Sequence, residues 1–176
     1  CIGCVSCARH CPTEAIRVRG GKARITESRC IDCGECIRYC PNHAKTAVTD
    51  SLEDLKNYRF NIALAAPSLY AQFDKNIPVS KILAGLKSLG FDKVAEVARG
   101  AEIATAALRE YLSHPGIKKP VISSACPASV RLILVKYPEL IEYLSPVDAP
   151  VEIAARIARQ EAKNQSGLPD ESIGVW

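Results

Sequence analysis

Nine cysteines carry the clearest chemical signal in this sequence of 176 residues, because eight of them lie within the first 40 positions. They form two runs in which three cysteines stand two residues apart and a fourth follows three residues later, directly before a proline. The first run is Cys1, Cys4, Cys7, Cys11 with Pro12, and the second, offset by 29 residues throughout, is Cys30, Cys33, Cys36, Cys40 with Pro41. The odd total and the close spacing disfavour a disulfide framework and favour metal or cluster binding.

Thiolates suit either zinc or iron–sulfur clusters, so the spacing has to decide between them. Structural zinc sites usually take their ligands from two separated Cys-x2–4-Cys pairs. The run found here is instead typical of bacterial ferredoxins, so the first 40 residues resemble a two-cluster ferredoxin. That resemblance implies two [4Fe–4S] clusters, one held by Cys1, Cys4, Cys7 and Cys40 and the other by Cys30, Cys33, Cys36 and Cys11. Two structural zinc sites are the alternative.

The segment between the two runs predicts the element that positions them. Residues 16–25 alternate in character around Gly20-Gly21, which is typical of a β-hairpin with a two-residue turn. We therefore expect residues 1–50 to form an α+β ferredoxin-like domain whose clusters supply much of its folding energy, because so short a chain buries little core. Tyr39 is expected to pack over a cluster, and His10 and His43 to be surface groups.

The remaining sequence predicts an incomplete α/β domain with a mainly parallel sheet. Residues 51–58 are polar and predict a short connecting helix or a linker, and residues 59–176 alternate between apolar runs and amphipathic stretches. Ser80 is a plausible N-cap for one of the helices. The expected strands are 61–66, 93–97, 121–125 and a last one near Ile173, and the expected helices are 80–89, 101–112, one from Pro127 and one over 150–163.

Cys126 is the ninth cysteine and lies apart from the others. It follows the expected strand 121–125 and precedes Pro127, a residue favoured in the first turn of a helix. A thiol between a parallel strand and a helix N-terminus is well placed to bind a ligand, and its pKa is lowered there. The alternative is a buried, inert cysteine that acts as a small apolar side chain.

Several segments of the second part resemble the iron-iron ([FeFe]) hydrogenases. They are Ser-Ser-Ala-Cys-Pro at 123–127, Lys-Tyr-Pro-Glu-Leu at 136–140 and Leu-Ser-Pro at 144–146. The first is similar to the family's first active-site motif, and the leading two-cluster module is also found in that family. The resemblance implies that Cys126 is a ligand of the [4Fe–4S] part of the H-cluster, the catalytic centre of these enzymes.

The sequence also departs from that family. Ala125 occupies the position of the cysteine that relays protons in catalytic members, and alanine has no exchangeable proton, so this route is expected to be lost. The departure resembles the sensory branch of the family. The chain begins at Cys1, has no methionine, and reaches Trp176 without counterparts of the second and third cysteine motifs. We therefore expect an N-terminal fragment with one of the H-cluster ligands, inactive by itself.

Composition excludes several classes of protein. With 48% apolar and 24% charged residues and a mean hydropathy of +0.02, the chain has the composition of a globular protein. It has no apolar run of about 20 residues and no signal peptide pattern, so we expect a cytoplasmic protein. The net charge of +4 is not gathered into a basic run, so no nucleic-acid partner is expected.

These observations predict an electron-transfer protein of hydrogenase-like type, in which two clusters pass electrons to or from an H-cluster site. Its expected partner is a redox protein or a signalling domain. Two alternatives stay open: a hydrogenase-like assembly factor or redox adaptor without hydrogen chemistry, and a plain ferredoxin-type carrier with a docking domain. Ala125 and the missing motifs leave all three in place.

Overall fold

The computed structural model describes residues 1–176, which form two compact units. The first unit contains residues 1–49 and 118–145, and the second contains residues 50–117 and 146–176. Residues 118–145 are thus grouped with the cysteine-rich part of the chain. The domain limits expected from the sequence, 1–50, 51–58 and 59–176, stay a prediction.

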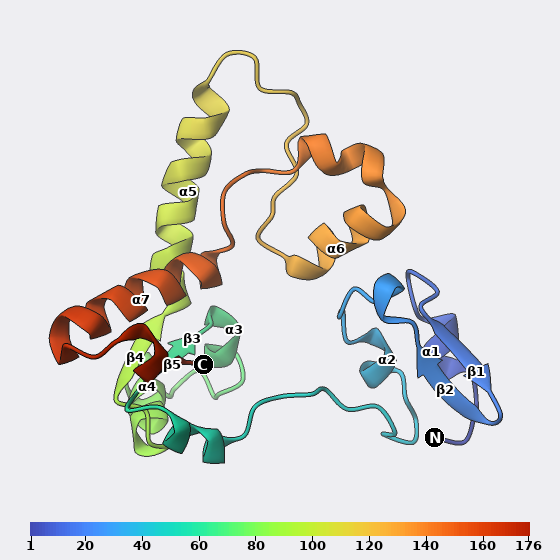
Figure 1. Ribbon diagram of the computed structural model, residues 1–176, viewed down its shortest axis with the longest axis horizontal. Helices are drawn as coiled ribbons and strands as arrows, with labels where there is room; N and C mark the ends of the chain where they lie inside the picture. Colours follow the sequence, from blue (N-terminus) through green and yellow to red (C-terminus); the bar gives the residue numbers. More distant parts are fainter. The chain divides into compact units, whose positions relative to one another are not determined.

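The first unit contains the predicted hairpin. β1 (Ile16–Arg19) and β2 (Lys22–Ile25) pair antiparallel, with Arg19 opposite Lys22. Gly20 and Gly21 form the turn with φ of 56° and 71°, values that glycine adopts without strain. The other elements of this unit are short or helical (Figure 1): α1 (Ser6–Arg9), η1 (Glu27–Arg29), α2 (Glu35–Arg38), α6 (Pro127–Lys136) and η3 (Pro138–Tyr143).

The prediction of a strand over residues 121–125 is wrong. Ile122 forms a single parallel bridge with Leu144, with hydrogen bonds from Ile122 N to Tyr143 O (2.7 Å) and from Ser145 N to Ile122 O (2.8 Å). The segment belongs to the first unit and joins no sheet. Its two apolar residues are followed by Ser-Ser-Ala, which offers little side-chain surface for packing against a layer of helices.

The second unit is built on a three-stranded parallel sheet, as the alternating pattern predicts. β3 (Phe60–Ala65) is central, and β4 (Lys93–Glu96) and β5 (Ile173–Val175) flank it. Ile62 lies opposite Lys93 on one side and opposite Val175 on the other. This unit is therefore an incomplete α/β domain. Two 3-10 helices, η2 (Leu52–Asn57) and η4 (Asp170–Ser172), lead into its strands.

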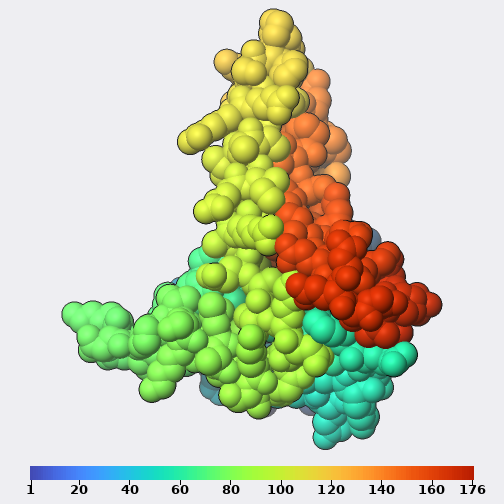
Figure 2. Space-filling view, turned by 90° about the vertical axis from the view of Figure 1, so that its left-hand side faces the viewer, coloured from blue at the N-terminus to red at the C-terminus, as the bar shows by residue number.

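Four α-helices accompany this sheet: α3 (Pro67–Tyr70), α4 (Val79–Ser88), α5 (Val97–Ser113) and α7 (Pro150–Ser166). The core forms where α7 covers the sheet, with Ala158 and Ala162 of the helix packed against Ile62 and Ile173. α5 lies against α7, as the yellow-green and red surfaces of Figure 2 show. Small residues on α7 allow this close layering.

Two helix beginnings differ from the expectation. α4 has Pro78, not Ser80, at its N-cap, because the extended backbone of Pro78 (φ −66°, ψ 143°) precedes a helix that already includes Ser80. α5 begins at Val97, four residues before the expected Ala101, and runs through Gly100. The missing side chain of Gly100 lets α7 approach closely, because a Cβ there would lie 2.1 Å from Pro150 O.

Among all helices of the chain, none is both long enough and apolar enough to cross a lipid bilayer.

Candidate iron–sulfur site

The two cysteine runs adopt the same backbone path. Each run wraps around a short helix, α1 in the first and α2 in the second, and the two helices are 29 residues apart, like the cysteines. Left-handed backbone occurs at equivalent places in both runs: at Gly3 and Asp32, at Val5 and Gly34, and at Glu14 and His43. Such conformations are uncommon for residues other than glycine. Their repetition means that the sequence repeat is also a structural repeat.

The first cavity of this unit is bordered by four thiols, those of Cys1, Cys4, Cys7 and Cys40. Three come from the first run, and the fourth is the trailing cysteine of the second run. Val18 and Ala23 of the hairpin complete an apolar wall. The hairpin therefore supplies one side of the cavity while the cysteine loops supply the other.

The second cavity has the complementary composition. Its four thiols belong to Cys30, Cys33, Cys36 and the trailing cysteine of the first run, Cys11. Ile16 and Ile31, both buried, form part of its lining. The trailing cysteines are thus exchanged between the two runs, and each cavity is closed by both halves of the repeat.

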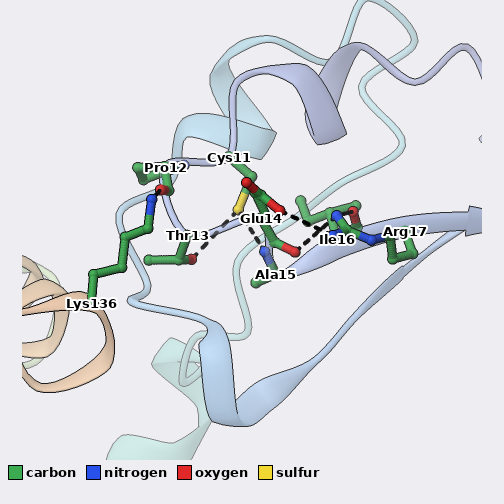
Figure 3. A network of polar contacts seen from close by, with 8 residues as sticks. All are labelled: Cys11, Pro12, Thr13, Glu14, Ala15, Ile16, Arg17 and Lys136. Carbon is green, nitrogen blue, oxygen red and sulfur yellow. Dashed lines mark hydrogen bonds and ion pairs between the residues drawn. The ribbon is translucent and has the colours of Figure 1, made fainter.

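Backbone amides donate hydrogen bonds to the trailing thiols in the same way in both halves. Ala15 N lies 3.2 Å from Cys11 Sγ, and Ala44 N lies 3.2 Å from Cys40 Sγ. Figure 3 shows the first of these, together with the contact of 3.7 Å between Cys11 Sγ and Thr13 Oγ1. A third amide, Ala23 N, lies 3.4 Å from Cys1 Sγ. Amide donors stabilise negative charge on sulfur, whether in a free thiolate or in a cluster ligand.

These contacts shift the pKa of the trailing cysteines downward. Burial raises the pKa of Cys11, but hydrogen bonds from Thr13 and Ala15 outweigh it. The pKa of Cys40 falls below its ordinary value because of the amides of Ala44 and Asn42. Both thiols therefore lose their proton, as ligation requires, more readily than an isolated cysteine.

Two cysteines of the second cavity, Cys30 and Cys36, have raised pKa values, unlike the trailing cysteines. The Asp32 amide lowers the pKa of Cys30, but burial and the carboxylate of Asp32, 3.3 Å from Cys30 Sγ, leave it raised. Burial also raises the pKa of Cys36, and the charge of Lys45 opposes part of that rise. Arg131 forms an ion pair with Asp32 and borders the same cavity.

α6 contacts the cysteine-rich residues through two cations that sequence reasoning missed. Arg131 pairs with Asp32, and Lys136 Nζ donates a hydrogen bond of 2.9 Å to Pro12 O (Figure 3). These partners are 99 and 124 residues away in the sequence. No local motif marks such contacts, because a cation on a helix surface is most simply interpreted as a solvated group.

Tyr39 borders neither cavity, which differs from its expected position over a cluster. Its ring stacks on His10 at 3.8 Å between centroids and 9° between planes. Ser6 Oγ donates to Tyr39 O (2.9 Å), and His10 Nδ1 lies 2.9 Å from Ser6 O. This set links α1 to the end of α2 at an exposed surface and accounts for His10 without a ligand role.

Cys126 is exposed, so the interpretation as a buried, inert thiol is wrong. It is the N-cap of α6, with Pro127 in the first turn, as expected. Hydrogen bonds from the side chain and then the backbone of Ser129 lower its pKa. Cys126 borders neither of the two cavities, and Ala125 N donates to Ser123 Oγ at 3.3 Å in the turn before it.

The cysteines surround space instead of converging on one point. No group of three or more His, Cys, Asp or Glu side chains lies close enough to hold a single metal ion. Each set of four thiols borders a cavity that opens between a loop and the hairpin. The donor set, four sulfurs with amide hydrogen bonds, fits an iron–sulfur cluster.

The fold and the thiol-lined cavities define an iron–sulfur protein, and comparison with known proteins agrees. Residues 1–46 match the family described as 4Fe-4S dicluster domain. Residues 59–175 match the family described as iron only hydrogenase large subunit, C-terminal domain. The chain therefore belongs to the iron-only hydrogenase large-subunit family, and the resemblance found in the sequence is confirmed.

Individual relatives support the same assignment. The NADP-reducing hydrogenase subunit HndD of Solidesulfovibrio fructosivorans is 23% identical over 130 residues, which cover 65% of this chain and 22% of the relative. Iron hydrogenase 1 of Clostridium pasteurianum is 30% identical over 97 residues, covering 53% of this chain and 17% of the relative. The chain thus spans about a fifth of the length of these curated relatives.

A solved structure is similar in fold. It comes from work titled "[FeFe]-hydrogenase Oxygen Inactivation is Initiated by the Modification and Degradation of the H cluster 2Fe Subcluster". The TM-score is 0.55 at 20% identity, and the match covers 70% of this chain and 36% of the other. At this identity the likeness concerns the fold. Together the findings define a hydrogenase-like iron–sulfur protein of the electron-transfer class.

Proposed function

We propose that this chain carries electrons through two [4Fe–4S] clusters. Cys1, Cys4, Cys7 and Cys40 would hold one cluster, and the second cavity's four cysteines, Cys11, Cys30, Cys33 and Cys36, would hold the other. The observation that carries the proposal is that each cavity is bordered by the very four thiols that the ferredoxin resemblance assigns to one cluster. When bound, such clusters accept and release single electrons.

The surrounding residues have distinct roles in this proposal. The amides of Ala15 and Ala44 donate to the trailing sulfurs and so fix their orientation and stabilise their negative charge. Buried Ile16 and Ile31 exclude water from the second cavity. Burial and hydrogen bonds to sulfur are two of the means by which a protein sets cluster potential.

The electrons would pass to or from an H-cluster site for proton reduction or hydrogen oxidation in a sensory hydrogenase-like protein. Cys126 would supply one ligand of that site, and a redox protein or signalling domain would be the partner. The sensory role is supported by Ala125, which has no exchangeable proton where catalytic members relay one. The exposed position of Cys126 leaves its thiol accessible to such a centre.

Anaerobic reconstitution of the 176-residue chain with iron and sulfide tests the cluster assignment. We expect about eight irons per chain, four for each cluster, and an EPR spectrum of interacting reduced [4Fe–4S] centres. Two bound zinc ions in the protein as isolated, with no iron taken up, would contradict it. Cys126→Ser should retain all eight irons, whereas Cys40→Ser should lose iron from the first cavity.

The H-cluster proposal needs a separate test. In a protein that contains this chain together with further cysteine motifs, infrared bands from CO and cyanide bound to iron would support an assembled H-cluster. Their absence after maturation, with the eight irons of the ferredoxin-like part in place, would favour a redox adaptor.

A further inference from the structure

Lys45 has a position that no other residue shares, because it borders both thiol-lined cavities. It follows the second cysteine run, five residues after Cys40, and its side chain is half-buried between the two sites. A positive charge at this place lies close to whatever occupies either cavity.

The internal repeat shows what the fold itself requires at this position. The residue 29 positions earlier, and so equivalent to Lys45, is Ile16. Ile16 is 2% exposed and borders only the second cavity. The backbone path therefore accommodates an apolar side chain here, and the cation of Lys45 is not needed to build the loop.

The ammonium group of Lys45 is held in place without being neutralised. Its Nζ donates a hydrogen bond of 3.4 Å to Ala23 O, and no carboxylate pairs with it. The same Ala23 donates its amide to Cys1 Sγ. The charge of Lys45 also reaches the second cavity, where it acts on the thiol of Cys36.

We propose that Lys45 is a shared positive charge that raises the reduction potential of both clusters. The inference rests on the proposed function, because it requires that both clusters bind. Each reduction adds one electron from an external reductant and breaks no bond, so it makes the cluster more negative by one charge. A nearby cation, poorly screened in a half-buried position, stabilises that added charge. Lys45 would thus act on both clusters through its charge, without ligating either of them.

The test is a redox titration of the reconstituted full chain, monitored by EPR, in four proteins: the unchanged chain, Lys45→Gln, Lys45→Arg and Arg19→Gln. Arg19→Gln is the matched control, because it removes one positive charge from an exposed residue of β1 that borders neither cavity. Iron content is measured first for every protein.

In Lys45→Gln we expect both clusters to be reduced less readily, with the ratio of reduced to oxidised cluster falling about tenfold at a given potential, or about 59 mV for a one-electron couple. Lys45→Arg should retain both potentials, and Arg19→Gln should leave them unchanged.

Three results would overturn the inference while leaving the clusters in place: a shift at one cluster alone, an equal shift in Lys45→Gln and Arg19→Gln, or a shift in Lys45→Arg as large as in Lys45→Gln. The last would mean that Lys45 shapes the loop and does not act through its charge. If the unchanged chain binds no iron, the proposed function itself is refuted.

Discussion

Gly100→Ala is the sharpest test of how the second unit is packed, because α5 and α7 cross at this residue. A Cβ on Gly100 would lie 2.1 Å from Pro150 O, 2.9 Å from Ala154 N and 3.1 Å from Ala154 Cβ. Two of these atoms belong to the backbone and cannot rotate away. The helices must therefore separate by more than about 1 Å to restore ordinary contact distances of 3.4–4 Å.

The expected cost follows from what α7 covers. Ala154, Ala158 and Ala162 are all at most 5% exposed and face the crossing or the sheet, so a retreat of α7 loosens the core around Ile62. Overpacking of this kind costs about 1–3 kcal/mol. Alanine recovers up to about 1 kcal/mol of helix propensity over glycine, so overpacking near the upper end of its range leaves a net loss of about 2 kcal/mol.

The matched control is Gly85→Ala in α4, where nothing lies within 4 Å of the added Cβ. It should stabilise the chain by about 0.5–1 kcal/mol through helix propensity. Urea denaturation of the reconstituted chain, followed by far-UV circular dichroism and by the emission of its single tryptophan, Trp176, measures the free energy of unfolding of both variants. A Gly100→Ala chain as stable as the Gly85→Ala chain would refute the close crossing of α5 and α7.

Two further predictions concern titratable groups of the second unit. Glu161 accepts hydrogen bonds of 2.7 Å from Lys93 and from Arg99, and both lower the pKa of its carboxyl group. Its contribution to the free energy of unfolding is therefore present above the unfolded-state pKa and is lost as the pH falls through the folded-state pKa. Because its side chain is 35% exposed, we expect this contribution to be only about 1 kcal/mol. In Glu161→Gln, the free energy of unfolding measured by urea denaturation should fall less steeply between pH 7 and pH 3. An unchanged pH dependence would contradict the ion pairs. Burial and then the hydrogen bond of 2.7 Å to Glu96 raise the pKa of Tyr70 to about 12. In Glu96→Gln, the absorbance titration of Tyr70 at alkaline pH should therefore move closer to that of an ordinary tyrosine. An unchanged titration would leave burial as the only cause of the raised pKa.

Much of the fold could be predicted because local signals and tertiary structure agree. Gly20-Gly21 between alternating residues predicts the hairpin, and apolar runs separated by helical stretches predict the parallel sheet of β3, β4 and β5. The prediction failed where a residue's role depends on a distant partner. The expected helix begins only at Ala101, but α5 begins at Val97 and includes Gly100, where the missing side chain leaves room for Pro150.

The same distinction applies to residues 121–125 and to the candidate site. Val121 and Ile122 favour a strand, yet strand formation needs a neighbour, and Ile122 finds only Leu144. The grouping of the eight cysteines is what the ferredoxin resemblance implies, and the same two groups border the two cavities. The places of Lys45 and Arg131 at the cavities could not be predicted, because they depend on how the chain folds and not on a local motif.

The exchange of trailing cysteines determines how oxidation of a thiol, or cleavage of the chain between the two runs, would affect the two cavities. Since Cys11 borders the cavity of the second run and Cys40 that of the first, neither half of the repeat is self-sufficient. Oxidation of one trailing thiol would open a wall in the opposite half, and a chain cut between the runs would leave both halves one sulfur short. Each run therefore depends on the other for the fourth thiol of its cavity, and damage to a trailing cysteine affects the cavity of the other run.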